Sequence, residues 1–224
     1  MPGFAIDPVY RVLKREFRRW HMPVVDLIQA QTRDPFKVLV STILSARTKD
    51  ETTAAASERL YRVVGRPADL ARLSERAIDR LIYPVGFHRA KTHYLHTLPE
   101  RLDALFGGRI PDTVEELVEL PGVGRKTANL VVALGFAKPA ICVDVHVHRI
   151  CNRWGYIRTA TPFDTEMRLR RILPIKYWIT INSYLVSYGQ HMCRPVNPRC
   201  DLCRLTRWCR RVDVRTRHLP RCKP

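Results

Sequence analysis

Four cysteines near the carboxyl end of the sequence could bind a metal, because thiolates are strong ligands for zinc and for iron–sulfur clusters. The four lie within 17 residues of one another and are Cys193, Cys200, Cys203 and Cys209. Zinc sites more often contain two pairs of cysteines in which two residues separate the partners, and this segment has one such pair. The spacing alone leaves zinc and an iron–sulfur cluster both open.

A glycine-containing turn and the lysine behind it form a second group of residues that could do chemistry. Pro121–Gly124 separates two helical stretches, and Arg125 and Lys126 follow it. Glycines permit positive φ, and main-chain N–H groups at the start of a helix suit a phosphate. Only eight of the 39 basic residues are lysines, and an arginine cannot supply a neutral amine. A neighbouring cation and a helix N-terminus favour that neutral form.

This turn is expected to contact a phosphate backbone, with an ordinary connection between two helices as the alternative. Its phosphate-contacting residues would be Gly122, Val123, Gly124 and Arg125. The formal net charge of +18 supports the first interpretation, because a protein this basic usually has a polyanionic partner. A generally solvated basic surface is the simpler reading of the charge.

The sequence contains no segment that predicts insertion into a membrane. The longest strongly apolar stretch, residues 130–137, is far too short to span a bilayer. The first residues lack the apolar core of a signal peptide. We therefore expect an intracellular protein, nucleoid-associated in the cytoplasm if it is bacterial or archaeal. Seven cysteines in a reducing compartment indicate metal or cluster ligation rather than disulfides.

Two segments carry a resemblance to a known family. Leu120–Ala128 resembles the helix-hairpin-helix signature of the endonuclease III family of base-excision DNA glycosylases, and Val143–Val147 resembles that family's Val-Asp-x-His segment. The similarity extends from about Pro35 to Cys209. It implies a 4Fe–4S iron–sulfur cluster on the four cysteines. It also implies that Lys126 is the Schiff-base nucleophile and Asp144 the catalytic carboxylate.

The chemistry of base excision is consistent with these two residue types. Breaking an N-glycosidic bond leaves positive charge on the sugar, which a carboxylate stabilises. An amine can capture C1′ as a Schiff base, after which elimination cuts the strand. Asp144 alone could be only a helix cap, and Lys126 alone only a phosphate contact. His146, two residues beyond Asp144, is expected to contact DNA or to orient local structure, with a core position nearly as favoured.

Other residues are expected to contact DNA. Arg194 and Arg199 lie in a proline-stiffened loop between the first two cysteines, which could follow phosphates. In the family, two further loops fill the space that a flipped nucleotide leaves. Here these loops contain Arg47 and Phe87, where relatives usually have glutamine and often leucine. Phe87 could wedge between bases or pack in the core. Both departures put the substrate range in doubt more than the chemistry.

The elements that position these residues are predicted to be helices with short connections. Asp34 and Pro35 predict a helix start, with a buried stripe that begins at Phe36. Asp112 and Glu115 predict a capping box for a helix that ends at Leu120. Further helices are expected over 51–64, 74–81, 91–105 and 144–153, with a last helix over Trp178–Tyr188. The fold class is therefore all-α.

The resemblance implies two helical lobes with a DNA-binding cleft between them. A six-helix barrel domain, residues 28–138, would contain the helix-hairpin-helix, and residues 1–27 with 139–224 would form the cluster domain. Asp144 lies just past this boundary, so the cleft should pair it with Lys126. Cys222 lies in a basic tail that is expected to be loosely ordered. Cys142 and Cys151 are expected to be buried packing residues.

The first functional prediction is excision of oxidised pyrimidines followed by β-elimination, by a monomer acting on damaged double-stranded DNA. A mismatch glycosylase acting on uracil, thymine or adenine is the second. Adenine-specific relatives usually lack the lysine, and relatives that remove oxidised guanine usually lack the four cysteines. A cluster-containing DNA-binding module without catalysis is the third. Substitution of Lys126 or Asp144 separates the third from the other two.

Overall fold

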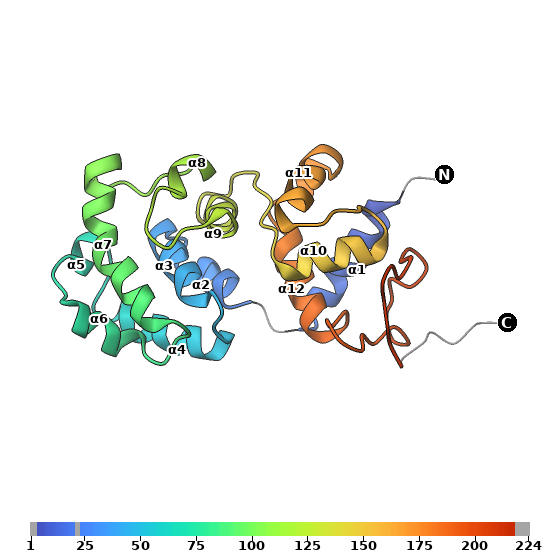
Figure 1. The fold of residues 1–224 in the computed structure, drawn as a ribbon, viewed down its shortest axis with the longest axis horizontal. Coiled ribbons are helices and arrows are strands. Elements are labelled where there is room, and N and C mark those ends of the chain that lie inside the picture. Colours follow the sequence, from blue (N-terminus) through green and yellow to red (C-terminus); the bar gives the residue numbers. More distant parts are fainter. Residues whose placement is uncertain (1–3, 21–22, 218–224) are drawn as a thin grey trace. The chain divides into compact units, whose positions relative to one another are not determined.

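The computed structural model describes residues 4–20 and 23–217, and over these residues the chain is all-α, as predicted. The chain forms two compact units, one of residues 23–140 and one that combines 1–22 with 141–224 (Figure 1). The sequence predicted 28–138 for the continuous unit. Among the described residues, no helix is long and apolar enough to cross a membrane. Cys222 and the last basic residues lie outside the described part.

The continuous unit consists of eight α-helices. They are α2 (Val24–Thr32), α3 (Pro35–Ser45), α4 (Asp50–Tyr61), α5 (Pro67–Leu70), α6 (Glu75–Ile82), α7 (His88–Phe106), α8 (Val114–Leu117) and α9 (Arg125–Leu130). A short π-helical segment, Val131–Gly135, continues α9. α3 contacts α2, α4, α7 and α9, so it is the central helix of this unit. Leu39 and Leu44 on α3 are fully buried.

The start of α3 follows the sequence signal. The side chain of Asp34 accepts a hydrogen bond from the Phe36 N–H, and Pro35 occupies the first turn, where a missing N–H costs nothing. Phe36 and the apolar residues after it are buried. The predicted helix start and its buried stripe are therefore confirmed.

The predicted capping box before α8 was wrong by one residue. Thr113, not Asp112, caps this helix, because its Oγ1 accepts from the Glu116 N–H and donates to the Glu116 carboxylate. The Asp112 carboxylate instead lies 2.5 Å from Lys138 Nζ. The helix also ends at Leu117, three residues before the predicted end, so the turn that follows is longer than expected.

The discontinuous unit joins the N-terminal helix to the C-terminal third of the chain. Its elements are α1 (Ile6–Phe17), α10 (Val145–Trp154), α11 (Pro162–Ile172), a single 3-10 turn (Ile175–Tyr177) and α12 (Ile181–His191). One apolar core includes Leu13, Ile150, Leu169, Leu185 and Tyr188. The sequence predicted that the last helix would run from Trp178 to Tyr188. It runs instead from Ile181 to His191, because Trp178 follows the 3-10 turn.

Candidate nucleic-acid interface and active site

The turn between α8 and α9 uses its two glycines differently. Gly122 has a φ of 73°, and a Cβ there would lie 2.4 Å from the ring of Tyr94. Gly124 has a φ of −89° and precedes α9. Among the described residues, and apart from Gly124 itself and its two chain neighbours, no heavy atom lies within 4 Å of the position that a Gly124 Cβ would take. Gly122 is therefore required by the turn itself, whereas the backbone at Gly124 is open to a ligand.

Lys126 lies in the first turn of α9, and its side chain is exposed. Val123 lies within the turn that precedes Lys126, and its buried side chain anchors that turn. The main-chain carbonyl of Arg125 accepts a hydrogen bond from Asn129 Nδ2, which ties the first turn of the helix to the next. The amine of Lys126 is therefore presented to solvent from a fixed backbone, beside the open backbone of Gly124.

Asp144 is the N-cap of α10, so the structural role considered for it is confirmed. Its Oδ1 accepts hydrogen bonds from the N–H groups of His146 and Val147, both at 2.9 Å. The residue is buried, with 8% of its surface exposed. Its Oδ2 accepts no hydrogen bond from the described residues. One carboxylate oxygen is thus fixed by the helix, while the other is left for another partner.

His146 lies in the first turn of α10, and its side chain faces α12. A Cβ on Gly189 of α12 would lie 2.2 Å from the His146 ring, so the ring packs directly against that backbone. Arg149 donates a hydrogen bond to His146 Nδ1 and another to the main-chain oxygen of Cys193. These contacts favour the orienting role among those considered for His146. Whether this ring also touches DNA stays a prediction.

Arg47 and Phe87 lie next to each other, although 40 residues separate them in the sequence. Both side chains are exposed, and 62% of the surface of Phe87 is accessible. The Arg47 guanidinium lies 5.4 Å from the centroid of the Phe87 ring, a cation–π contact. Because Phe87 is exposed, the core position considered for it was wrong.

Two residues that the sequence did not single out each hold a loop that contains predicted DNA-contacting residues. Lys91 is buried and donates its hydrogen bonds to main-chain and hydroxyl oxygens of residues 44–48. Asn197 accepts hydrogen bonds from the Arg217 N–H and the Thr216 hydroxyl, which fastens the loop that contains Arg194 and Arg199. The scarcity of lysine was a usable signal for the first, and an asparagine between prolines for the second.

The four cysteines gather in the segment after α12. Burial, together with the neighbouring thiols of Cys203, Cys193 and Cys200, raises the pKa of Cys209 to about 11, so the four side chains lie close enough to interact electrostatically. Cys203 Sγ lies 3.0 Å from the Tyr188 hydroxyl, and Cys193 Sγ accepts a hydrogen bond from Arg153. All four are free thiols.

The four cysteines could hold either a zinc ion or an iron–sulfur cluster, and the two centres need different arrangements of their ligands. Among the described residues, no three His, Cys, Asp or Glu side chains form a group that could bind one metal ion. A zinc ion requires its ligands to converge on one point at about 2.3 Å. A 4Fe–4S cluster takes one cysteine at each iron, so its four ligands need not converge. The four neighbouring thiols could supply one ligand to each iron of such a cluster.

Cys142 and Cys151 are both 1% exposed and are packing residues, as predicted. Burial raises the pKa of Cys151 far above its usual range, because a thiolate in an apolar interior loses its hydration.

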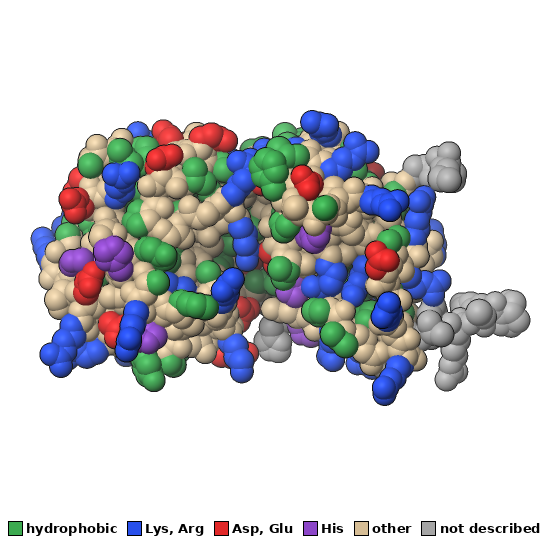
Figure 2. Space-filling view, in the orientation of Figure 1, with side chains coloured by type: hydrophobic (Ala, Val, Ile, Leu, Met, Phe, Trp, Pro, Cys, Tyr) green, Lys and Arg blue, Asp and Glu red, His purple; other side chains and the backbone are tan. Residues whose placement is uncertain are grey.

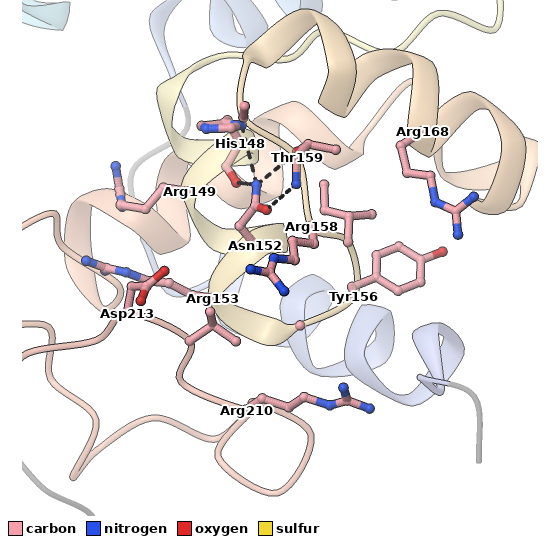
Figure 3. A pocket seen from close by; sticks show the side chains of 14 residues that line it. His148, Arg149, Asn152, Arg153, Tyr156, Arg158, Thr159, Arg168, Arg210 and Asp213 are labelled. Carbon is pink, nitrogen blue, oxygen red and sulfur yellow. Dashed lines mark hydrogen bonds between the residues drawn. The ribbon is translucent and has the colours of Figure 1, made fainter. Parts of the chain in front are cut away.

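An arginine-lined hollow of about 1310 Å³ lies beside the C-terminal half of α10 (Figure 3). Arg153 at its edge is already bonded to the main-chain oxygens of Arg194 and Pro195. The exposed side chains of Arg158, Arg168 and Arg210 also line it, and none of the three forms an ion pair within the described part of the chain. Lys and Arg side chains are also spread over the face seen in Figure 2.

Comparisons with known proteins agree with these features. Residues 40–174 match the family described as HhH-GPD superfamily base excision DNA repair protein. The chain is 43% identical to Endonuclease III of Thermotoga maritima, over 91% of this chain and 92% of the relative. It is 44% identical to Endonuclease III-like protein 1 of Gallus gallus, over 75% of this chain and 61% of the relative.

Solved structures show the same similarity. A trapped Endonuclease III–DNA covalent intermediate matches with a TM-score of 0.81 and 30% identity, over 92% of this chain and 94% of that chain. A thermostable thymine-DNA glycosylase shares the fold, with a TM-score of 0.74 at 21% identity, over 90% of this chain and 97% of that chain. The resemblance read from the two sequence motifs is confirmed: the chain belongs to the endonuclease III family, within the HhH-GPD superfamily of base excision DNA repair proteins.

Proposed function

We propose that this protein removes oxidised pyrimidines from double-stranded DNA and then cuts the strand by β-elimination through a Schiff base on Lys126. Membership of the endonuclease III family makes it a DNA glycosylase and abasic-site lyase. The assignment of oxidised pyrimidines follows the family, and the role of Lys126 is supported chiefly by one observation. An exposed lysine follows a turn whose Gly124 backbone is open to a phosphate.

Lys126 would act as the nucleophile. Its neutral amine attacks C1′, the bond from C1′ to the base breaks, and the base leaves with the bonding electrons and takes up a proton. The bond from C1′ to O4′ then breaks, O4′ takes up a proton as a hydroxyl, and the opened sugar is left as an iminium ion that joins the lysine nitrogen to C1′. Loss of a proton from C2′ then expels the 3′ phosphate by β-elimination. Water finally hydrolyses the iminium and restores the amine.

Asp144 would stabilise the positive charge that develops on the sugar as the base leaves. Its Oδ1 is held by two main-chain N–H groups of α10, so the carboxylate is fixed before the substrate arrives. Its Oδ2 would face the charge. The pairing of this carboxylate with Lys126 belongs to the proposal.

The cysteines Cys193, Cys200, Cys203 and Cys209 would hold a 4Fe–4S cluster. When bound, such a cluster supplies rigid cross-linking of the segment after α12. The residues of the chain itself then present the loop with Arg194 and Arg199, which Asn197 fastens from within. Those two arginines, both exposed, would contact phosphates. A brown preparation with four irons per chain supports this part, and a colourless protein with one zinc per chain contradicts it.

Borohydride trapping tests the central step, because it reduces the iminium to a stable covalent bond. A duplex with thymine glycol should give a trapped protein–DNA product with the wild type and none with Lys126→Gln. Lys138→Gln is the matched control, since Lys138 lies in the same unit and contacts Asp112 instead. Absence of a trapped product with the wild type would contradict the lyase mechanism.

A substrate panel tests the choice of base. Duplexes would carry thymine glycol, dihydrouracil, uracil, thymine or an abasic site, each opposite all four bases. The proposal expects the highest single-turnover rates with the two oxidised or reduced pyrimidines. Faster cleavage of uracil, or of thymine opposite guanine, would favour the mismatch-glycosylase alternative.

A further inference from the structure

Lys91 is a buried cation that the proposed mechanism does not use. It lies in the first turn of α7 and is 4% exposed. Among the described residues, no carboxylate lies within ion-pair distance of it. Its Nζ donates instead to the main-chain oxygens of Leu44 and Ala46, both at 2.7 Å, and to Thr48 Oγ1 at 3.0 Å. All three donors of the ammonium group are therefore satisfied.

The acceptors explain why a cation can be buried here without an acid. Leu44 and Ala46 lie at the C-terminal end of α3, where carbonyl groups lack partners within the helix. The partial negative charge of a helix C-terminus stabilises a cation. Lys91 is thus a C-terminal cap of α3 that is supplied by another helix, α7.

The same contacts join two loops. Thr48 Oγ1, which accepts from Lys91, also accepts a hydrogen bond from the Gly86 N–H at 3.1 Å. A Cβ on Gly86 would lie 2.4 Å from the main-chain oxygen of Arg47, so the two loops touch through their backbones. The loop after α3 and the loop before α7 therefore form one structure, with the Lys91 ammonium at its centre.

The two loops joined through Lys91 and Thr48 hold Arg47 and Phe87 in an unusual backbone conformation. Both residues are in the left-handed region, with φ of 53° and 57°. Residues other than glycine adopt this conformation only where the surrounding structure enforces it. Here it turns an exposed arginine and an exposed aromatic ring toward each other, in cation–π contact.

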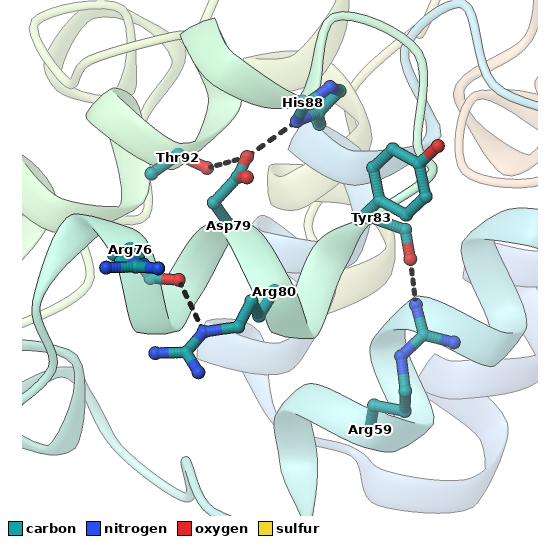
Figure 4. A network of polar contacts seen from close by, with 7 residues as sticks. All are labelled: Arg59, Arg76, Asp79, Arg80, Tyr83, His88 and Thr92. Atoms are coloured by element: carbon teal, nitrogen blue, oxygen red, sulfur yellow. Dashed lines mark hydrogen bonds and ion pairs between the residues drawn. The ribbon is translucent and has the colours of Figure 1, made fainter.

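The opposite side of Phe87 is anchored as well (Figure 4). The Asp79 carboxylate of α6 lies 2.6 Å from His88 Nδ1 and accepts a hydrogen bond from the Thr92 hydroxyl. Arg59 of α4 donates to the main-chain oxygens of Leu81 and Tyr83. The backbone on both sides of Phe87 is therefore fixed, and its ring is the part that remains exposed.

An exposed ring beside a guanidinium has the chemistry to stack on unpaired bases. Extrusion of a nucleotide leaves such bases without stacking partners. We propose that Lys91 is a positioning residue that holds Arg47 and Phe87 as one preassembled wedge, which occupies the gap left by the extruded nucleotide. Lys91 itself does not touch DNA. This inference rests on the proposed function, because it assumes that the two exposed residues face the duplex.

The test compares two substrates that differ in their need for the wedge. A duplex with thymine glycol requires nucleotide extrusion, whereas a single-stranded abasic oligonucleotide requires only the lysine chemistry. Lys91→Met keeps the aliphatic stem and removes all three hydrogen bonds. Thr48→Val is a milder second variant that removes only the hydroxyl that joins Lys91 to Gly86. Lys138→Met is the matched control, a lysine of the same unit that lies away from these loops.

We expect Lys91→Met to lower the single-turnover rate on the duplex by about 10- to 100-fold, because small displacements of positioning groups have effects of that size. The rate on the single-stranded substrate should stay unchanged, and so should both rates of Lys138→Met. Thr48→Val should lower the duplex rate in the same direction. A 2-aminopurine base next to the lesion should brighten on binding to the wild type and not on binding to Lys91→Met, since extrusion removes its stacking.

The outcomes that contradict the inference differ from those that contradict the proposed function. Equal losses on both substrates would make Lys91 a residue of the fold only. If the duplex rates of Lys91→Met and Thr48→Val are unchanged while Phe87→Ala is slower, Phe87 acts as a wedge that does not depend on Lys91 for its position. Failure of the wild type to cleave the single-stranded abasic substrate would instead contradict the proposed lyase chemistry.

Discussion

The guanidinium of Arg47 lies over the ring of Phe87, 5.4 Å from its centroid, and the two residues share the left-handed backbone conformation. A cation–π contact at an exposed site contributes about 0.5–1 kcal/mol. The two side chains should therefore act together rather than independently when the protein engages a duplex.

A double-mutant cycle checks this coupling. Phe87→Leu keeps an apolar wedge and removes the ring that faces the guanidinium, and Arg47→Gln removes the cation. We expect each single change to lower the excision rate on a thymine glycol duplex. The double variant should lose less than the product of the two single effects, with a coupling of about 0.5–1 kcal/mol. If the changes in activation free energy of the two single variants simply add up in the double variant, the pair has no joint role.

Substitutions of Asp144 should separate helix capping from catalysis. Asp144→Asn retains an oxygen that can accept from the His146 and Val147 N–H groups, so the free energy of unfolding should change little. Asp144→Ala should cost about 1 kcal/mol, the usual effect of losing an N-cap. Both variants should lose base excision, because both lack the negative charge. Urea denaturation and excision assays on the same preparations measure the two effects. Retained excision in Asp144→Asn would assign the residue to capping alone.

The two glycines of the hairpin form a matched pair. Gly122→Ala places a side chain at positive φ and against Tyr94, so it should destabilise the protein by about 1–2 kcal/mol or more. The new methyl group of Gly124→Ala would meet no side chain or backbone beyond its chain neighbours in the part of the chain that the structure describes, so the free energy of unfolding should change by about 0.5 kcal/mol or less. If a phosphate approaches the backbone at Gly124, that methyl group should nevertheless weaken DNA binding. Fluorescence anisotropy with an abasic-analogue duplex measures it, and unchanged affinity would place the phosphate elsewhere.

The buried Lys91 should give stability a characteristic pH dependence. Burial lowers the pKa of Lys91 to about 8, whereas the unfolded lysine titrates near 10.5. Between these values the unfolded chain binds more protons than the folded one, so the free energy of unfolding rises with pH. The cost of burying the charge is thus fully present below pH 8 and is relieved as the pH approaches 10.5.

Urea denaturation at several pH values tests this sign. The wild type minus Lys91→Met difference in unfolding free energy should increase from pH 8 to 10, because the other titrating groups cancel. A difference that is flat or falls over this range would show that the folded lysine keeps its ordinary pKa.

The arginine-lined hollow should contribute to binding of undamaged DNA. Each phosphate contact contributes about −0.9 to the slope of log affinity against log salt concentration on duplex DNA. Neutralising Arg158, Arg168 and Arg210 to glutamine should therefore make that slope shallower on a long duplex. A titration of affinity against salt concentration measures this effect.

A control with the same net charge is available on and near α6. Glutamine at the exposed Arg72, Arg76 and Arg80 removes the same three charges from the other unit. The hollow variant should change the slope more than this control. Equal changes would mean that only the total charge of the chain matters, and not the hollow.

Much of the fold could be predicted from local signals. Asp34 and Pro35 marked the start of α3 because capping and the first helical turn depend on adjacent residues. α11 was missed although Thr161 and Asp164 form a capping box before it. α1 was missed although Ile6, Val9, Tyr10 and Leu13 have helical spacing and are buried. In both cases the signal was present in the sequence.

Other features depend on contacts that no local pattern contains. Both Asp112 and Thr113 are residue types that can cap the start of α8. Thr113 does so, and Asp112 forms an ion pair with Lys138 instead. Lys91 could be noticed as one of few lysines, but its acceptors lie more than 40 residues earlier in the chain. The contact between the loops that contain Arg47 and Phe87 likewise forms only in the folded unit. The sequence motifs indicated the chemistry, whereas the contacts that hold these motifs in place are seen only in the structure.

Because one of the two units is assembled from two separate stretches of the chain, the two units can fold at different times during synthesis. Residues 23–140 are continuous, so they can complete their core as soon as they leave the ribosome. α1 emerges earlier, but it packs on α12, which is synthesised more than 160 residues later. α1 therefore cannot pack until α12 has been synthesised. The hairpin-bearing unit can close before α12 emerges, whereas the cysteine-bearing unit can close only afterwards.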